Sequence, residues 1–438
     1  MDIFGASTFR VAAVDLNGQM RGKRVPAAYA AKLEEGAVRM PLSVLNVDIL
    51  GADIDDSPLV FETGDADGVL KPTDRGAMPL PWLESMQPLV PMMMYLDDGT
   101  PFYGDARHAL ITVLDRYAER GWEVIAATEL EFTLVDDSGK QPRHVRDPRS
   151  GRRVKSSEIL SLSQMDTFDP FLSALYDGCA AMGIEAQTTT SEAGVGQFEV
   201  TLNHQSALRA ADDTWLFKAL IRGLAHKFGT AATFMAKPFP GDSGNGMHMH
   251  FSVLGAGGAN IFDDGGPKGT DTLRHAVAGC LKALRPSTLI MAPHANSYAR
   301  MVTGAHAPTG ICWAYENRTA AIRIPGGAPA GRRIEHRVAG GDINPYLTFA
   351  AILGAAFTGI EDGDEPPAPL TGNAYGQELP QMAEDWATAI ADLESSAQLA
   401  RIFDPRLIRN LVLTKRQELE HMNQIPEEAH WKTYLEKV

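Results

Sequence analysis

The sequence predicts a protein of two unequal domains that combines strands with helices, and three patterns support this prediction. Residues 8–15 and 20–25 flank the pair Asn17-Gly18, a strong signal for a tight hairpin turn. Residues 47–90 are rich in Asp, Gly and Pro, which is typical of short strands and turns. From Ala106 to Arg120 apolar residues recur at helical spacing. We therefore expect a small domain over residues 1–104 and a larger one over residues 105–438.

Helical and loop segments follow one another in the larger part. Residues 168–182 and 212–228 have the spacing of amphipathic helices. Residues 143–155 carry six basic side chains, and we expect a solvent-exposed loop there rather than a phosphate site. Residues 361–376 have the composition of a loop, in which Tyr375 is expected to be an ordinary loop residue, and helices are expected from residue 381 onward.

The composition excludes several classes of protein. The 438 residues include 40 Lys and Arg against 55 Asp and Glu, so the formal net charge is −15. This acidic balance argues against nucleic-acid binding, which needs a basic surface to displace counterions. We see no run of 18 apolar residues and no signal peptide, so we expect no membrane segment. The three cysteines form no CxxC pair and are expected to be reduced thiols of a cytoplasmic protein.

Four predicted strands carry Glu, His or Arg on one face. Side chains two residues apart in a strand point to the same side. These polar faces are Glu129, Glu131 and Thr133; Gln197, Glu199 and Thr201; His248, His250 and Ser252; and Arg333, Glu335 and Arg337. The last strand can also be read from its other face, where only His336 is polar.

A strand with one polar face is ordinary in an antiparallel sheet. Four such strands carrying Glu, His and Arg, which bind metals and oxyanions, instead indicate a functional site. If the faces converge, their glutamates concentrate a negative charge that only cations offset. Oxygen ligands with an imidazole and without cysteine suit Mg²⁺ or Mn²⁺ better than Zn²⁺. Two such ions beside several arginines are suited to phosphoryl transfer from a nucleotide, and a two-metal phosphohydrolase is one possibility. Neither a P-loop nor a complete GxGxxG motif is present, since residues 255–260 do not complete the latter.

Several motifs, in this order, resemble the glutamine synthetase superfamily from about Arg10 to about Arg416. They are Asp15-Leu-Asn-Gly18, Glu129-Leu-Glu131-Phe132, Glu192 with Gly196-Gln-Phe-Glu199, Phe234-Met-Ala-Lys-Pro238, Gly244-Asn-Gly-Met-His248, Asn296-Ser-Tyr-Ala-Arg300, Asn317-Arg318, Arg323-Ile-Pro325, Arg333-Ile-Glu-His-Arg337 and Asn344-Pro-Tyr346. The resemblance implies an α+β glutamine synthetase fold, with a small N-terminal β-grasp-like domain and a catalytic domain built on an antiparallel, metal-lined sheet. It also implies stacked rings of subunits, with each active site shared between neighbours.

The resemblance also implies ligands, position by position. It implies two or more Mg²⁺ or Mn²⁺ ions, one held by Glu131, Glu192 and Glu199 and another by Glu129, His248 and Glu335. It implies a glutamate site made of Glu131, Gly244, Arg300 and Arg337, and ATP contacts from His250, Ser252, Arg323 and Arg333. Arg318 corresponds to the arginine that stabilises the transferring phosphoryl group. The implied reaction activates glutamate as a γ-glutamyl phosphate, which an amine then attacks, releasing ADP and phosphate.

The sequence departs from the family pattern where ammonium would bind. His306 stands where glutamine synthetases carry a glutamate two residues before a proline, and the loop before Asp48 lacks the Asp-Gly-Ser-Ser pattern. A neutral imidazole offers a base and a less polar wall, so we expect a substituted amine and a catalytic role for His306. The glutamate–amine ligase branch of the superfamily is the one most similar to Ala305-His306-Ala307, Trp313, Tyr315 and the segment Gly340–Tyr346.

We favour methylamine as the amine, giving γ-glutamylmethylamide. A diamine's second ammonium would need an anionic or aromatic partner, for which Asp48, Asp53 and Trp313 are candidates. Putrescine or ethanolamine is the alternative, and ammonia is less favoured. A non-catalytic member of the superfamily is least favoured, because all six expected metal positions keep ligating side chains.

Overall fold

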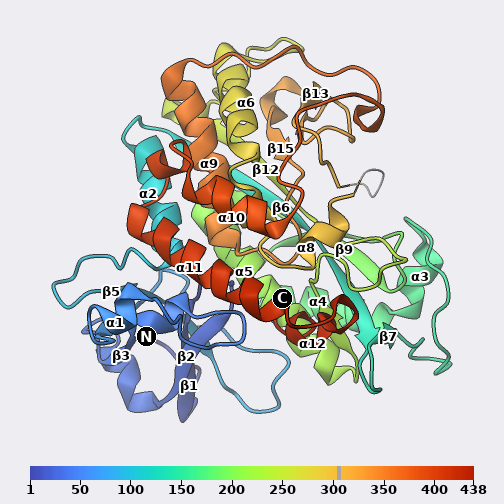
Figure 1. The fold of residues 1–438 in the computed structure, drawn as a ribbon. Coiled ribbons are helices and arrows are strands. Elements are labelled where there is room, and N and C mark those ends of the chain that lie inside the picture. The colour runs from blue at the N-terminus through green and yellow to red at the C-terminus, as the bar shows by residue number, and fades with distance from the viewer. Residues whose placement is uncertain (303–306) are drawn as a thin grey trace.

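The computed structural model describes residues 1–302 and 307–438. A five-stranded sheet in the order β2-β1-β5-β4-β3 forms within the first 95 residues, at the lower left of Figure 1. Its strands are β1 (Thr8–Val14), β2 (Met20–Pro26), β3 (Val38–Pro41), β4 (Asp67–Pro72) and β5 (Leu89–Tyr95). β1 and β2 pair antiparallel, and Gly18 in their turn has a φ of +78°, so the expected hairpin is confirmed.

β1 contributes to two hydrophobic cores. Phe9 and Val11 pack into a small core within the N-terminal sheet, whereas Ala12 and Val14 belong to the main core of the molecule. The alternation of side chains along the strand explains this division. β1 is therefore buried on both faces, and the domain boundary expected after residue 104 stays a prediction.

A ten-stranded sheet forms the centre of the larger part. Its main order is β13-β14-β15-β12-β6-β9-β8, and β7, β10 and β11 also pair with β6. The strands are β6 (Glu123–Asp136), β7 (Arg143–His144), β8 (Ala186–Ser191), β9 (Gln197–Leu202), β10 (Gln205–Ser206), β11 (Ala231–Thr233), β12 (Met247–Leu254), β13 (Trp313–Tyr315), β14 (Ile322–Ile324) and β15 (Ile334–His336). The four strands expected from their polar faces are neighbours here, in the order β15-β12-β6-β9, and their pairings are antiparallel.

Several helices cover the apolar face of this sheet. The helices of the described residues are α1 (Pro58–Phe61), α2 (Ala106–Ala118), α3 (Leu162–Thr167), α4 (Asp169–Ala181), α5 (Ala207–Lys227), α6 (Asp271–Leu284), α7 (Thr288–Met291), α8 (Ser297–Arg300), α9 (Pro345–Asp362), α10 (Trp386–Glu394), α11 (Pro405–Met422) and α12 (Trp431–Tyr434). α2 and α5 contact β6, and α9 packs against α2, α5 and α6 (Figure 1). Leu130 and Phe132 of β6 are fully buried in this core. The polar face of the sheet therefore lies on the side away from these helices.

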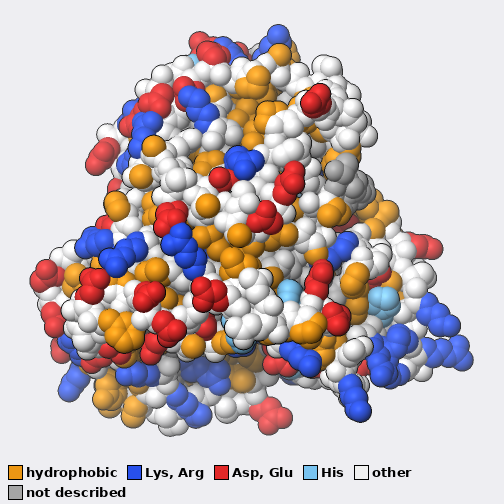
Figure 2. Space-filling model, in the orientation of Figure 1, with side chains coloured by type: hydrophobic (Ala, Val, Ile, Leu, Met, Phe, Trp, Pro, Cys, Tyr) orange, Lys and Arg blue, Asp and Glu red, His pale blue; other side chains and the backbone are white. Residues whose placement is uncertain are grey.

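Two segments test the expected boundaries further. α5 begins at Ala207, five residues before the expected start at Asp212. Asp212 therefore lies inside the helix, where its carboxylate binds Arg107. The basic segment 143–155 is mostly exposed outside β7, as expected, and Figure 2 shows Lys and Arg side chains gathered at the lower right. Within the described ranges, no helix combines the length and the apolar character needed to cross a bilayer.

Candidate active site

The register of the large sheet brings the expected acidic residues together. Glu131 on β6 lies opposite Glu199 on β9, and Glu129 on β6 lies opposite His248 on β12. Residues directly opposite each other in an antiparallel pair share a face of the sheet. Four of the expected metal ligands therefore form one polar row across three neighbouring strands.

The row continues onto β15 and β14. His250 lies opposite Glu335, and Glu335 lies opposite Arg323. His336 faces the other side, where burial and then the charge of His248 lower its pKa to about 3. The two possible faces of β15 are thus distinguished: Glu335 faces the acidic row, and His336 faces away from it.

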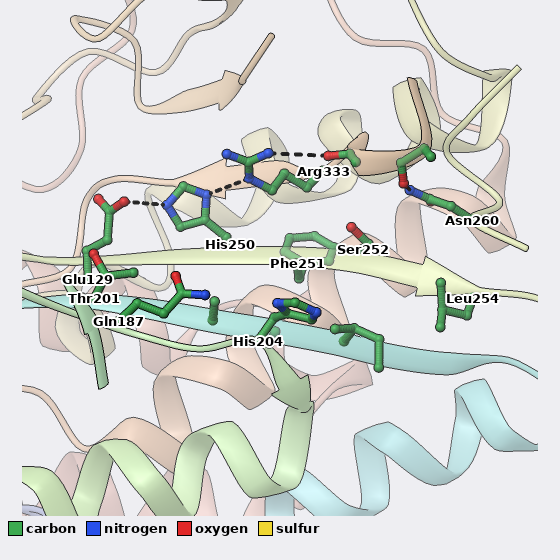
Figure 3. A pocket seen from close by; sticks show the side chains of 15 residues that line it. Glu129, Gln187, Thr201, His204, His250, Phe251, Ser252, Leu254, Asn260 and Arg333 are labelled. Atoms are coloured by element: carbon green, nitrogen blue, oxygen red, sulfur yellow. Dashed lines mark hydrogen bonds and ion pairs between the residues drawn. The ribbon is translucent and has the colours of Figure 1, made fainter. Parts of the chain in front are cut away.

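Two overlapping groups of side chains in this row are close enough to hold a cation. The ligand atoms of Glu129, Glu199 and His248 lie within 4.8 Å of one another, as do those of Glu129, His250 and Glu335. His248 Nδ1 is 2.9 Å from Glu129 Oε2. His250 Nε2 is 3.2 Å from Glu129 Oε1, the contact that Figure 3 shows. Glu129 thus lies at the centre of the site.

The charges in this row are only partly balanced by the protein. Burial, together with the carboxylates of Glu129, Glu131 and Glu192, raises the pKa of Glu199 to about 9. Burial also raises the pKa of Glu131, and the charge of Glu192 adds to it. The carboxylate of Glu199 accepts no hydrogen bond from the described part of the chain. Like charges held together in a low-dielectric site favour protonation unless a cation is present.

Other members of the row have cationic or imidazole partners. Burial alone would raise the pKa of Glu129, but hydrogen bonds with His248 and His250 hold it far below its usual range. Burial likewise opposes ionisation of Glu335, but Arg337 first and then the two histidines lower its pKa. Arg323 Nη1 lies 2.7 Å from Glu335 Oε2, and Arg337 Nη1 contacts the other oxygen.

These residues fit divalent cations that prefer oxygen ligands. The donors are carboxylates and imidazoles, with no thiolate, and the repulsion at Glu199 is of the kind that a bound cation relieves. Glu192 lies in the loop between β8 and β9, where its Oε1 accepts a hydrogen bond from Thr190 at 3.2 Å. Strand alternation could not indicate Glu192 because it is not in a strand, and only the family resemblance did.

The residues expected to bind glutamate meet just before β12. A Cβ atom at Gly244 would lie 3.0 Å from Cγ of Arg300 and closer still to a backbone carbonyl, so only glycine fits there. The backbone N–H of Gly246 donates to Glu131 Oε2 at 2.5 Å. Arg300 is 5% exposed and its charge interacts with that of Glu131. The structure thus brings three of the four expected glutamate contacts together.

Arg337, the fourth expected contact, brings an additional residue with it. Arg337 Nε and the hydroxyl of Tyr375 are both buried without a hydrogen-bond partner among residues 1–302 and 307–438. Burial raises the pKa of Tyr375, and the charges of Arg337 and Arg300 oppose this shift, so all three side chains are close. A buried donor without a partner is costly unless a ligand satisfies it. The expectation that Tyr375 is an ordinary loop residue is therefore wrong, because long-range packing, which local sequence does not indicate, brings its loop to the site.

A pocket of about 510 Å³ adjoins Glu129 on the other side (Figure 3). Three of the four expected ATP contacts line it: His250, Ser252 and Arg333. Arg333 Nε donates to His250 Nδ1 at 3.2 Å, which orients both side chains toward the pocket. The volume is in the range of nucleotide and drug-sized sites.

Four further polar side chains line this pocket and were not expected there. They are Gln187, Thr201, His204 and Asn260. Thr201 was visible on the polar face of its strand, and Asn260 ends the glycine-rich segment that does not complete a dinucleotide motif. Asn260 Nδ2 donates to the carbonyl of Arg332 at 2.7 Å. Gln187 lies in β8, which pairs with β9, and His204 follows β9, which pairs with β6. The sequence alone does not reveal these pairings.

The remaining expected residues are placed differently. Arg323 contacts Glu335 and does not line the pocket. Arg318 is exposed, and its charge acts on Glu192. His306 lies outside the described residues.

β12 arranges the site in a linear order. Gly244 and Gly246, beside Arg300, precede the strand, His248 lies in the acidic row, and His250 and Ser252 lead into the pocket. A carboxylate held by arginines would thus lie on one side of the possible cation positions and a nucleotide on the other. This geometry is suited to transferring a phosphoryl group to a carboxylate.

Comparison with known proteins gives a consistent result. The family described as glutamine synthetase, catalytic domain, matches residues 103–434. γ-Glutamylputrescine synthetase PuuA of Escherichia coli is 34% identical over 371 residues, 84% of this chain and 78% of that protein. γ-Glutamylethanolamide synthetase GlnA4 of Streptomyces coelicolor is 31% identical, over 93% of this chain and 87% of that protein.

A solved structure, the GmaS–ADP complex, has a TM-score of 0.84 at 27% identity and covers 98% of this chain and 96% of its own. The expected glutamine synthetase fold is therefore confirmed. The relatives place the chain with glutamate–amine ligases, enzymes that form carbon–nitrogen bonds.

Proposed function

The chain belongs to the glutamine synthetase family, and on this basis we propose that it ligates glutamate to a small primary amine, converting ATP into ADP and phosphate. The order of the site along β12 carries this proposal. Arg300 lies before the acidic row, and His250 and Ser252 line the pocket after it. A phosphohydrolase would need no site for a second carboxylate substrate, whereas a ligase does.

The arginines and the pocket divide the binding of the two substrates. Arg300 and Arg337 would hold the α-carboxylate of glutamate, a role suited to planar guanidinium groups. Tyr375 has a buried hydroxyl close to both and would contact the same carboxylate or the amine. His250 and Ser252 would contact the nucleotide in the pocket.

Divalent cations would be held by the six carboxylate and imidazole side chains of Glu129, Glu131, Glu192, Glu199, His248 and Glu335. When bound, they would neutralise phosphate charge and polarise the reacting oxygens. Without such neutralisation, the acidic row would repel both substrates, which are anions.

The chemistry requires two steps, because a carboxylate is a poor electrophile. An oxygen of the glutamate γ-carboxylate attacks the γ-phosphorus of ATP, and the bond from this phosphorus to the bridging oxygen of ADP breaks. The neutral amine then attacks the γ-carbonyl carbon of the acyl phosphate, loses a proton, and phosphate leaves. Arg318 and Arg323 would stabilise the charge on the transferring phosphoryl group. We propose His306 as the group that accepts the proton.

Methylamine is the amine that we propose. Asp48 and Trp313, two candidate partners for a diamine's second ammonium, are engaged within the chain. Asp48 accepts hydrogen bonds from the backbone N–H groups of Leu50 and Ala52 at 2.9 and 2.8 Å. Trp313 is buried, and its indole N–H donates to a backbone carbonyl at 2.7 Å. These contacts support a small monoamine, whereas the names of PuuA and GlnA4 favour putrescine and ethanolamine as alternatives.

A panel of amines tests this proposal. Phosphate release is measured with ATP, glutamate and Mg²⁺ or Mn²⁺ plus methylamine, ethanolamine, putrescine or ammonia, and each product is identified by mass. We expect the highest kcat/KM with methylamine and a γ-glutamylmethylamide product. A higher value with putrescine or ethanolamine would reassign the amine, and ammonia as the best substrate would contradict the amine-ligase proposal. ATP turnover without any γ-glutamyl product would contradict ligation itself.

We also propose that the chain assembles into stacked rings in which neighbours complete each active site. Light scattering on the active enzyme measures the assembly directly. A fully active monomer at assay concentration would contradict this proposal.

A further inference from the structure

Glu316 follows β13 and has an unusual backbone conformation. Its φ of +52° lies in the left-handed region, which side chains other than glycine rarely adopt. Strained residues of this kind persist only where surrounding contacts hold them, and they cluster at functional sites. Glu316 immediately precedes Asn317-Arg318, one of the motifs of the site.

Two contacts of the carboxylate hold this conformation. Glu316 Oε1 accepts a hydrogen bond from the backbone N–H of Gly326 and lies 3.4 Å from Arg323 Nη2. A Cβ atom at Gly326 would lie 3.0 Å from the Glu316 carboxyl, so glycine allows the close approach. The backbone N–H of Glu316 also donates to Ile324 at 3.1 Å. The carboxylate is thereby docked against the turn that follows β14.

Both partners of Glu316, Arg323 and Gly326, are connected to the nucleotide side of the site. Arg323 donates from Nη2 to Glu316 and from Nη1 to Glu335 Oε2, in the acidic row, the latter at 2.7 Å. The segment that starts at Gly326 continues to Gly331 and Arg333, which line the pocket. The Glu316 carboxylate therefore connects the guanidinium expected to contact phosphate with the loop that borders the nucleotide.

Packing alone does not explain this arrangement. The Glu316 side chain is 59% exposed, so it contributes little to a core. Exposed ion pairs add little to stability. A strained backbone combined with an exposed carboxylate is better explained by orientation of its partners than by stabilisation of the fold.

We propose that Glu316 is a positioning residue for ATP, which holds Arg323 and the segment 326–333 so that Arg323 presents its guanidinium to the phosphates. This inference rests on the nucleotide role of Arg323 in the proposed function. Glu316 does not touch the reacting atoms itself. Its removal should therefore affect the use of ATP more than the use of glutamate.

The experiment compares E316Q, E316A and E316G with wild type and with E394Q, a control at an exposed ion pair distant in sequence. Binding of a non-hydrolysable ATP analogue with Mg²⁺ is measured by calorimetry, alongside KM for ATP, KM for glutamate, kcat and Tm. We expect E316A to weaken analogue binding and raise KM for ATP by about tenfold, as loss of a hydrogen bond to a charged group predicts. E316Q should retain the contact to Gly326 and lose less, while KM for glutamate stays within about twofold.

E316G separates the carboxylate from the backbone strain, because glycine adopts a positive φ without cost. We expect it to be as defective as E316A toward ATP. Wild-type ATP affinity in E316A or E316G would overturn the proposal, as would tighter binding, which would mean that Glu316 competes with phosphate for Arg323. An equal loss of ATP affinity, glutamate affinity and Tm would indicate a merely structural role and overturn it as well. If wild type binds no nucleotide, the proposed function itself fails, which this measurement reports separately.

Discussion

Glu418 and Glu199 are both mostly enclosed glutamates, but the protein surrounds them differently. Glu418 is 2% exposed and accepts hydrogen bonds from Asn17 Nδ2 at 2.9 Å, from the N–H of Ile49 at 2.8 Å and from Lys415 Nζ at 2.8 Å. Glu199 has no such partner in the described ranges and faces other carboxylates, with the result that its pKa is raised to about 9.

The difference separates a structural charge from a functional one. Glu418 joins the N-terminal hairpin to α11, and all of its partners belong to the chain. Burying a charge without a partner is unfavourable, so a site that keeps several unbalanced carboxylates needs a ligand from outside. Buried charges that the chain satisfies by itself therefore indicate stability, and those that it leaves unbalanced indicate the active site.

Replacing Glu199 by glutamine should have the largest effect on activity. E199Q keeps the size of the side chain but removes a charged oxygen ligand, and we expect turnover to fall by about 10³-fold. Unfolding in denaturant without divalent cations should show a stability equal to or above that of wild type, because folding no longer has to protonate a carboxyl that is ionised in the unfolded chain. Retained turnover in E199Q, or a clear loss of its stability, would contradict the assignment of Glu199 as a functional charge and not a structural one.

Replacing Glu418 by glutamine should have the opposite effect. It leaves the Lys415 ammonium buried without a counter-charge, and we expect the free energy of unfolding to fall by about 3 kcal/mol. KM values of the folded enzyme should stay near those of wild type. E394Q is the control. Glu394 ends α10 and forms an exposed ion pair with Arg416 of α11, the helix that carries Glu418, and its replacement should change stability by less than about 0.5 kcal/mol. A loss in E394Q equal to that in E418Q would contradict the account.

The pH dependence of stability should show a smaller effect of the same origin. The folded pKa of Glu199 is about 9 and its unfolded value is 4.5, so between these values the folded state holds a proton that the unfolded state lacks. The metal-free protein should therefore lose stability as pH rises from 6 to 8, by up to about 1.4 kcal/mol per pH unit for this group. Denaturant unfolding at several pH values measures the slope. E199Q, or saturating Mn²⁺, should flatten it, and an unchanged slope in both would be inconsistent with the assignment.

The local parts of the fold and site could be predicted from the sequence. The turn at Asn17-Gly18 follows from backbone preference, and the faces of β6, β9 and β12 follow from alternation. Alternation alone left the face of β15 undecided between Glu335 and His336, because only its pairing with β12 decides which side faces the acidic row. Glu192 came from the family motif alone.

Features that depend on long-range packing could not be predicted. Apolar spacing places the start of α5 at Asp212, five residues too late. The partner of the Asp212 carboxylate, Arg107, is 105 residues away in the sequence. Asn260 and Tyr375 reach the site from loops whose composition gives no sign of it. The strain at Glu316 depends on the turn at Gly326, which is ten residues away in sequence.

Titration of the metal-free protein with Mn²⁺ tests the central claim most directly. Calorimetry on wild type, E199Q and E418Q at pH 7 should give two ions bound per chain in wild type and in folded E418Q. Wild type should release protons on binding, because a cation favours ionised carboxylates. In E199Q we expect at least one ion to bind about tenfold or more weakly, with less proton release. Equal Mn²⁺ binding in wild type and E199Q, without proton release in either, would contradict the claim that the unbalanced carboxylates of the sheet form the metal site.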